Sequence, residues 1–154
     1  MKQVVAKPRL QCARSALVNC SYANLWKHML RKIENPQFYV PGVTNVKILS
    51  KKDGVTMRQM TLPNGKTITE RITYDEKAQQ VVFTLVEHPV YEGSVYNRIS
   101  GNDTLQPIIL IYGYQWKLKN KDNESIMLET EKEMETMLPK AVQHSADVAE
   151  EQQL

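Results

Sequence analysis

The strongest candidate for chemistry is a carboxylate that lies among apolar residues. Between residues 66 and 74 apolar and polar residues alternate, which places Glu70 on the same side of a strand as Ile68 and Ile72. A carboxylate in an apolar enclosure has a raised pKa and can exchange protons near neutral pH. Glu70 is therefore the candidate general acid or base. The alternative is that it is a structural partner of a neighbouring polar side chain.

The turn after residue 62 decides which side chain faces Glu70. If Asn64-Gly65 is a two-residue turn, Gln59 lies opposite Glu70; if residues 63–65 form a three-residue loop, Arg58 takes that place. Arg58 would compensate a carboxylate that is costly to bury alone. With the two-residue turn, and with the later loops also preserving the alternation, one inward row is predicted. It consists of Ile48, Gln59, Glu70, Phe83, Asn97 and Leu110.

Three aromatic residues follow one another on the same side of the last predicted strand, namely Tyr112, Tyr114 and Trp116. Their polar atoms can hydrogen-bond a ligand, but such a row also packs well against a helix. We predict that these three residues and Phe83 form the walls of a cavity. Glu70, with Gln59 or Asn97, would then be its polar anchor.

Histidine and cysteine offer little chemistry in this sequence. The interpretation places His28 on the exposed side of a helix, His88 in a loop and His144 on the last helix, without a metal partner or a nucleophile nearby. Cys12 and Cys20 are the only cysteines and lack the paired spacing of a zinc site. We expect no metal and no cofactor, and reduced thiols of a cytoplasmic protein.

The elements that would hold these residues follow from periodicity. Turn signals recur about every ten residues between 43 and 118, where the hydrophobic period is two, and they predict six antiparallel strands. These strands cover residues 43–52, 55–62, 66–74, 79–87, 93–100 and 107–118. A further edge strand is expected within residues 3–19.

Two segments have a helical period instead. Ser21 precedes an apolar stripe that ends before Asn35-Pro36, which predicts a capped helix followed by one short turn. Residues 123–150 predict a long helix with a kink or an end at Pro139, and a tail that is frayed from about residue 148.

Size and charge exclude several classes of protein. A chain of 154 residues is the usual size of one domain, which we assign to 1–154. No apolar run approaches the roughly 20 residues needed to cross a bilayer, so we expect a soluble protein. The net charge of +3 is modest and the basic residues near the N-terminus are scattered, so no nucleic-acid partner is expected. A homodimer is compatible with the sequence.

Several segments resemble a known family. They are NLWKHMLRKIENPQFYVPGVTNVKIL, MRQMTLPNGKTITERITY, GSVYNRIS and YGYQWKL, within residues 21–118. They are similar to the AtaL-like family of the SRPBCC superfamily, which includes START-like lipid-binding domains, the birch-pollen allergen fold and aromatic polyketide cyclases. The resemblance implies an α+β helix-grip fold. In this fold a curved seven-stranded antiparallel sheet wraps around a long C-terminal helix, with two short helices after the first strand. It also implies an apolar cavity between sheet and helix.

Three functions are compatible with these observations. The leading hypothesis is binding of a small, mainly apolar or aromatic molecule in the internal cavity. The second is a cofactor-independent enzyme of the cyclase or aromatase type, with Glu70 as general base and a tyrosine as oxyanion donor. The third is a protein-interaction domain whose cavity is filled by its own side chains. An empty cavity of several hundred Å³ would separate the third hypothesis from the first two.

Overall fold

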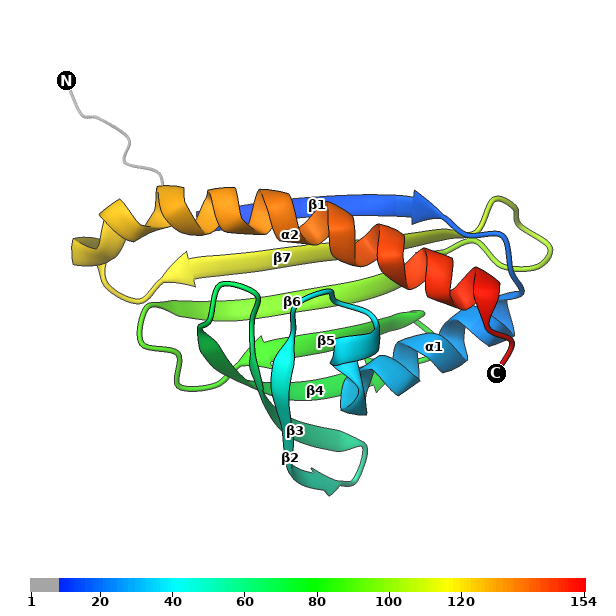
Figure 1. Cartoon of the computed structure of the whole chain (residues 1–154), viewed down its shortest axis with the longest axis horizontal. Helices are drawn as coiled ribbons and strands as arrows, with labels where there is room; N and C mark the ends of the chain where they lie inside the picture. Colours follow the sequence, from blue (N-terminus) through cyan, green and yellow to red (C-terminus); the bar gives the residue numbers. More distant parts are fainter. Residues whose placement is uncertain (1–8) are drawn as a thin grey trace.

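A curved antiparallel sheet wraps around a long C-terminal helix in the computed structural model, which describes residues 9–154 (Figure 1). In chain order the elements are β1 (Arg9–Leu17), α1 (Tyr22–Glu34), the 3-10 turn η1 (Pro36–Phe38), β2 (Thr44–Lys52), β3 (Val55–Thr61), β4 (Thr67–Asp75), β5 (Gln80–Leu85), β6 (Tyr91–Ser100), β7 (Ile109–Leu118), η2 (Lys121–Asn123) and α2 (Glu124–Glu151). The seven strands of this part of the chain are ordered β1-β7-β6-β5-β4-β3-β2. The helix-grip prediction is confirmed.

The strand predictions are also confirmed, with boundaries shifted by at most two residues. The expected edge strand within residues 3–19 is β1, which pairs antiparallel with β7. Short connections link β2 through β7 in sequence order, so each strand pairs with its neighbour in the chain. In Figure 1, β2 and β3 curl forward from the rest of the sheet, while α1 lies near the C-terminal end of α2.

Helix α1 begins and ends where the sequence predicts. The Ser21 side chain accepts a hydrogen bond from the backbone N–H of Asn24, which is the usual cap of a helix N-terminus. Trp26, Met29 and Ile33 are buried on one stripe. The chain then leaves the helical region at Asn35 and makes the single turn η1.

Helix α2 buries one side against the sheet. Its buried apolar residues include Met134, Leu138 and Val142, which are spaced four residues apart and therefore share a face. The helix continues through Pro139 to Glu151 instead of ending at the proline. Proline removes one backbone donor there, and the packing of the stripe on both sides of Pro139 supports the unbroken helix.

The C-terminal tail, residues 152–154, is hydrogen-bonded to α1, whereas the sequence predicts fraying from about residue 148. The Asn24 side chain donates to the carbonyls of Ala149 and Gln152 at 2.8 and 3.0 Å and accepts from the N–H of Leu154 at 2.8 Å. The prediction that His28 is exposed is wrong, because only 2% of its surface is accessible. Its ring nitrogens lie 2.8 Å from the Tyr39 hydroxyl and 2.7 Å from the Gln152 carbonyl oxygen.

The inward face of the sheet matches the prediction for β4 but not for β3. Ile68, Glu70 and Ile72 are buried, whereas the residues between them and at the start of β4 are exposed or half-buried. Arg58, not Gln59, lies opposite Glu70, because residues 63–65 form a three-residue loop closed by a hydrogen bond from the N–H of residue 62 to the carbonyl of residue 66. Gln59 therefore faces the other side of the sheet and is half-buried.

The predicted inward row needs further corrections, because Phe83 faces Val95 instead of Asn97, and Asn97 faces Tyr112 instead of Leu110. Glu70 pairs with Leu85 instead of Phe83, because the loop between β4 and β5 is two residues longer than assumed; the side of the sheet is unchanged. Ile48 lies opposite Arg58 but is 37% exposed, because β2 is an edge strand with register shifts along its length.

None of the helices in the described part of the chain, residues 9–154, is long and apolar enough to cross a membrane.

Candidate functional site

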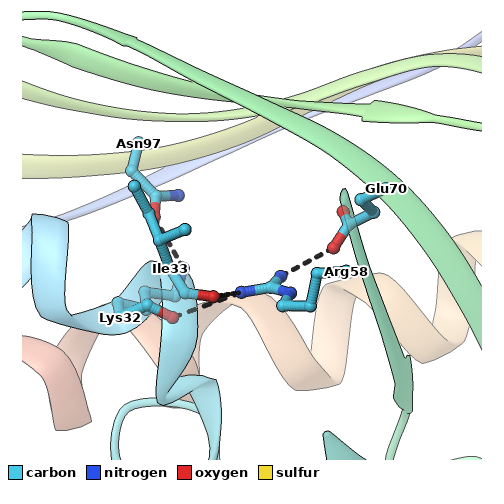
Figure 2. A network of polar contacts seen from close by, with 5 residues as sticks. All are labelled: Lys32, Ile33, Arg58, Glu70 and Asn97. Atoms are coloured by element: carbon cyan, nitrogen blue, oxygen red, sulfur yellow. Dashed lines mark hydrogen bonds and ion pairs between the residues drawn. The ribbon is translucent and has the colours of Figure 1, made fainter. Parts of the chain in front are cut away.

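A buried ion pair lies at the centre of the inward face. The Arg58 Nη2 atom is 2.7 Å from the Glu70 Oε1 atom, and both residues are 2% exposed (Figure 2). The second terminal nitrogen of Arg58 donates to the backbone carbonyls of Ile33 and Lys32, at 2.9 and 3.2 Å. These carbonyls belong to the last turn of α1, where backbone acceptors lack helical partners. Arg58 thus ties α1 to the sheet and neutralises Glu70.

The amine of Lys32 is buried beside this pair. Its Nζ atom donates to the Asn97 Oδ1 atom at 2.6 Å and lies 4.1 Å from the centre of the Tyr112 ring and 4.9 Å from that of Phe83. The hydrogen bond and the ring contacts favour the charged amine. Burial opposes them and, together with the smaller effect of Arg58, lowers the pKa of Lys32, while Glu70 raises it; the resulting pKa is about 7.

These side chains surround an inner chamber of about 60 Å³, and three of its lining residues have an unused donor. The buried Arg58 Nε, Asn97 Nδ2 and Trp116 Nε1 atoms have no hydrogen-bond partner within the described residues. Nearly all buried polar groups in proteins are hydrogen-bonded, so three unpaired donors on residues that line one chamber need an explanation. All three atoms are donors, and a group that satisfied them would carry acceptor oxygens or nitrogens.

A larger cleft of about 920 Å³ lies outside the chamber, between α2 and the loops β3–β4 and β5–β6. Its wall is mainly apolar and includes an aromatic cluster, in which the rings of Tyr91 and Trp116 stack at 5.5 Å and His88 lies against both. The Tyr91 hydroxyl donates to Thr130 on α2 at 2.7 Å and fixes one side of the cleft.

Five residues line both spaces, so the chamber lies directly behind the wall of the cleft. They are Leu62, Ile68, Trp116, Met134 and Met137. The two methionines are flexible side chains that can adjust to the shape of a ligand.

Most of the residues predicted for the site lie around the same space. Glu70, Phe83, Asn97, Tyr112 and Trp116 all line the inner chamber. Tyr114 lines neither space; it is buried behind Trp116, with their ring centres 5.5 Å apart. Gln59 lies on the opposite face and contributes nothing to either space.

The Tyr112 hydroxyl is engaged by the protein itself. It donates to the Ser145 hydroxyl on α2 at 2.6 Å, and Ser145 in turn donates to the Tyr39 carbonyl at 3.3 Å. Burial raises the pKa of Tyr112 above its usual range. Tyr112 therefore contributes its ring to the chamber, while its hydroxyl stabilises the contact between β7 and α2.

Sequence reasoning missed Lys32 completely. The signal was present, because Leu25, Met29 and Lys32 lie at helical positions i, i+4 and i+7 and are all buried. A lysine on such a face is normally exposed at its charged end, so the pattern alone did not distinguish a buried amine from a solvated one.

Together, the sheet, the long helix and a cavity with a polar inner end define a helix-grip domain. A family model described as acetylaranotin biosynthesis cluster protein L, AtaL, matches residues 13–152. The chain therefore belongs to the AtaL family.

Solved structures with the same fold include aromatase/cyclases. The Zhui aromatase/cyclase from Streptomyces sp. R1128 aligns with a TM-score of 0.76 at 16% identity. The alignment covers 92% of this chain and 94% of the Zhui chain. The protein TTHA0849 from Thermus thermophilus aligns with a TM-score of 0.70 at 10% identity, covering 92% and 97%. The di-domain aromatase/cyclase StfQ of the steffimycin pathway aligns with a TM-score of 0.70 at 11% identity; 94% of this chain corresponds to 50% of that protein.

At such identities these similarities establish the fold alone. No curated protein matches the sequence.

Proposed function

We propose that this domain binds a small, mainly apolar or aromatic molecule that carries a keto or phenolic oxygen. The apolar body lies in the outer cleft, and the oxygen reaches the inner chamber. The observation that carries the proposal is the set of three buried donors, on Arg58, Asn97 and Trp116, that have no hydrogen-bond partner among residues 9–154.

The chemistry of the chamber selects the type of ligand atom. An unpaired buried donor costs roughly 1 to 3 kcal/mol, and an acceptor on the ligand recovers part of this cost. The unused atoms are N–H groups, so an oxygen acceptor fits and an ammonium or another donor does not. A cleft of about 920 Å³ has the volume of a small-molecule site.

Two other hypotheses lose support from the same geometry. A cavity filled by its own side chains does not fit a cleft of this size. Glu70 is held at 2.7 Å by a buried guanidinium, which favours its structural role over that of a general base. An enzymatic function would therefore need a reactive group other than Glu70.

Titration calorimetry with two probes tests the proposal. β-Naphthol has a phenolic oxygen, whereas β-methylnaphthalene has the same bicyclic body without an acceptor. We expect β-naphthol to bind more tightly. Trp116→Phe, which removes one N–H and keeps most of the ring, should weaken β-naphthol binding by roughly two- to tenfold.

The matched control is Trp26→Phe, because Trp26 is the second tryptophan of the chain and lines neither the cleft nor the chamber. It should leave β-naphthol binding unchanged. Equal affinities for the two probes, together with no effect of Trp116→Phe, would remove the role of the donors. No binding of either probe at its solubility limit would refute the proposal as a whole.

A further inference from the structure

A primary amine lies where a ligand carbonyl would end. The Lys32 side chain extends from α1 to the inner chamber, and its Nζ atom is 2.6 Å from the Asn97 Oδ1 atom. Figure 2 shows Lys32 and Asn97 on one side of Arg58 and Glu70 on the other. Lys32, Arg58 and Asn97 thus line the same small space.

We propose that Lys32 binds carbonyl ligands covalently, by forming an imine with an aldehyde or ketone carbon that reaches the chamber. This inference rests on the proposed function, because the cleft must first admit the ligand. It adds a reactive group and a substrate class, namely aromatic or apolar aldehydes and ketones.

The amine has the properties of a nucleophile. Its pKa is lowered to about 7, first by burial and then by Arg58, so about half of it is neutral at neutral pH. An ordinary exposed lysine is neutral in only about one molecule in 2,500 under the same conditions. The charged or titratable groups that face it are Arg58 on β3, Glu70 on β4 and Tyr112 on β7. Desolvated lysines of this kind form Schiff bases with carbonyl substrates.

The unused donors can supply the remaining chemistry. N–H groups of Arg58, Asn97 and Trp116 can hold the carbonyl oxygen and polarise the C=O bond. The lone pair of the neutral amine attacks the carbonyl carbon and gives a carbinolamine. Both amine protons then end on the carbonyl oxygen, the C–O bond breaks, one water leaves and a C=N bond remains. The reaction needs no oxidant or reductant.

The space suffices for the reacting end of a ligand. One water molecule needs roughly 10 to 15 Å³ of such cavity volume, so a chamber of about 60 Å³ holds a group of a few heavy atoms. The body of the ligand would remain in the outer cleft, past the flexible side chains of Met134 and Met137 that line both spaces.

Borohydride trapping tests this inference on the full chain. The protein is incubated with β-naphthaldehyde near pH 7 and reduced, which converts an imine to a stable secondary amine. Intact mass should show one adduct per chain, and peptide mapping should place it on Lys32. Lys32→Met should lose at least nine tenths of the adduct. Lys27→Met, an exposed lysine of the same helix, should leave it unchanged.

Adduct spread over surface lysines, or undiminished in Lys32→Met, would overturn the inference. If Lys32→Met does not fold, the peptide map of the unaltered chain still decides. Calorimetry with β-naphthol separates this inference from the proposed function. Binding of β-naphthol without any adduct refutes imine formation alone, whereas failure of both refutes both.

Discussion

Replacing Glu70 by Gln tests whether the buried ion pair holds the fold together. Gln keeps the size and one acceptor oxygen but removes the charge that compensates Arg58. The Arg58 guanidinium would remain 2% exposed, with its hydrogen bonds to the end of α1 as its main remaining partners. Breaking a buried pair by removing one partner costs about 3 to 5 kcal/mol. We expect a loss in the free energy of unfolding within this range.

The assay is urea denaturation followed by circular dichroism, with Glu92→Gln as the matched control. Glu92 forms an ion pair with Lys117 at 3.2 Å, but both side chains are about half exposed, so the same substitution should cost no more than about 1 kcal/mol. The double variant Arg58→Met with Glu70→Leu should be more stable than Glu70→Gln, because it removes both charges. A Glu70→Gln variant as stable as Glu92→Gln would refute the role of Glu70 as the compensating charge.

Three other predictions follow from buried contacts. The Lys32 amine has a pKa of about 7 in the folded chain and about 10.4 when unfolded, so the unfolded chain binds more protons between these values. The free energy of unfolding should therefore rise with pH in this window, by up to about 1.4 kcal/mol per pH unit relative to Lys32→Met, and parallel urea stabilities from about pH 7.5 to about pH 9 would contradict this. Tyr112→Phe should lower the free energy of unfolding by roughly 1 to 3 kcal/mol, because the buried Ser145 oxygen loses its donor; an unchanged denaturation midpoint would argue against that contact. Deleting residues 152–154 should lower the melting temperature, because His28 loses its partner at 2.7 Å; an equal melting temperature would show that the tail contributes nothing.

The fold was predictable because periodicity and turn signals agree along the chain. The alternation between residues 43 and 118 and the helical stripe after Asn123 specify strands and helix independently of their partners. The side of each strand that faces inward was also predictable where an alternating run is long, as in β4. Tertiary contacts determined the rest, including the docking of residues 152–154 on α1.

The register was less predictable, because it depends on the exact number of residues in each loop. An error of one residue at the loop 63–65 exchanges Arg58 with Gln59 on the inward face, and the sequence left both choices open. An error of two residues changes only the neighbour: across the loop between β4 and β5, Glu70 faces Leu85 and not Phe83, and across the loop between β5 and β6, Phe83 stays inward although it faces Val95 and not Asn97. Whether a loop has an odd or an even number of residues therefore decided which side chains face the site, and the exact strand boundaries mattered less.

The charges of the chamber suggest why Lys32 escaped prediction and what it is for. Lys32 and Arg58 face one carboxylate, Glu70, so the protonated chamber has an excess positive charge that burial makes costly. A fold selected for stability alone would have an apolar residue at position 32. Rules that predict structure from sequence assume this kind of consistency, so they do not predict a buried lysine there. A ligand with a phenolate or enolate oxygen would supply the missing negative charge and raise the pKa of Lys32 again. Binding of a phenol that is already ionised at neutral pH, such as a dinitrophenol, should therefore be accompanied by uptake of up to about half a proton per chain near pH 7. Calorimetry in buffers of different ionisation enthalpy measures this uptake directly, and an equal uptake in Lys32→Met would assign it to another group.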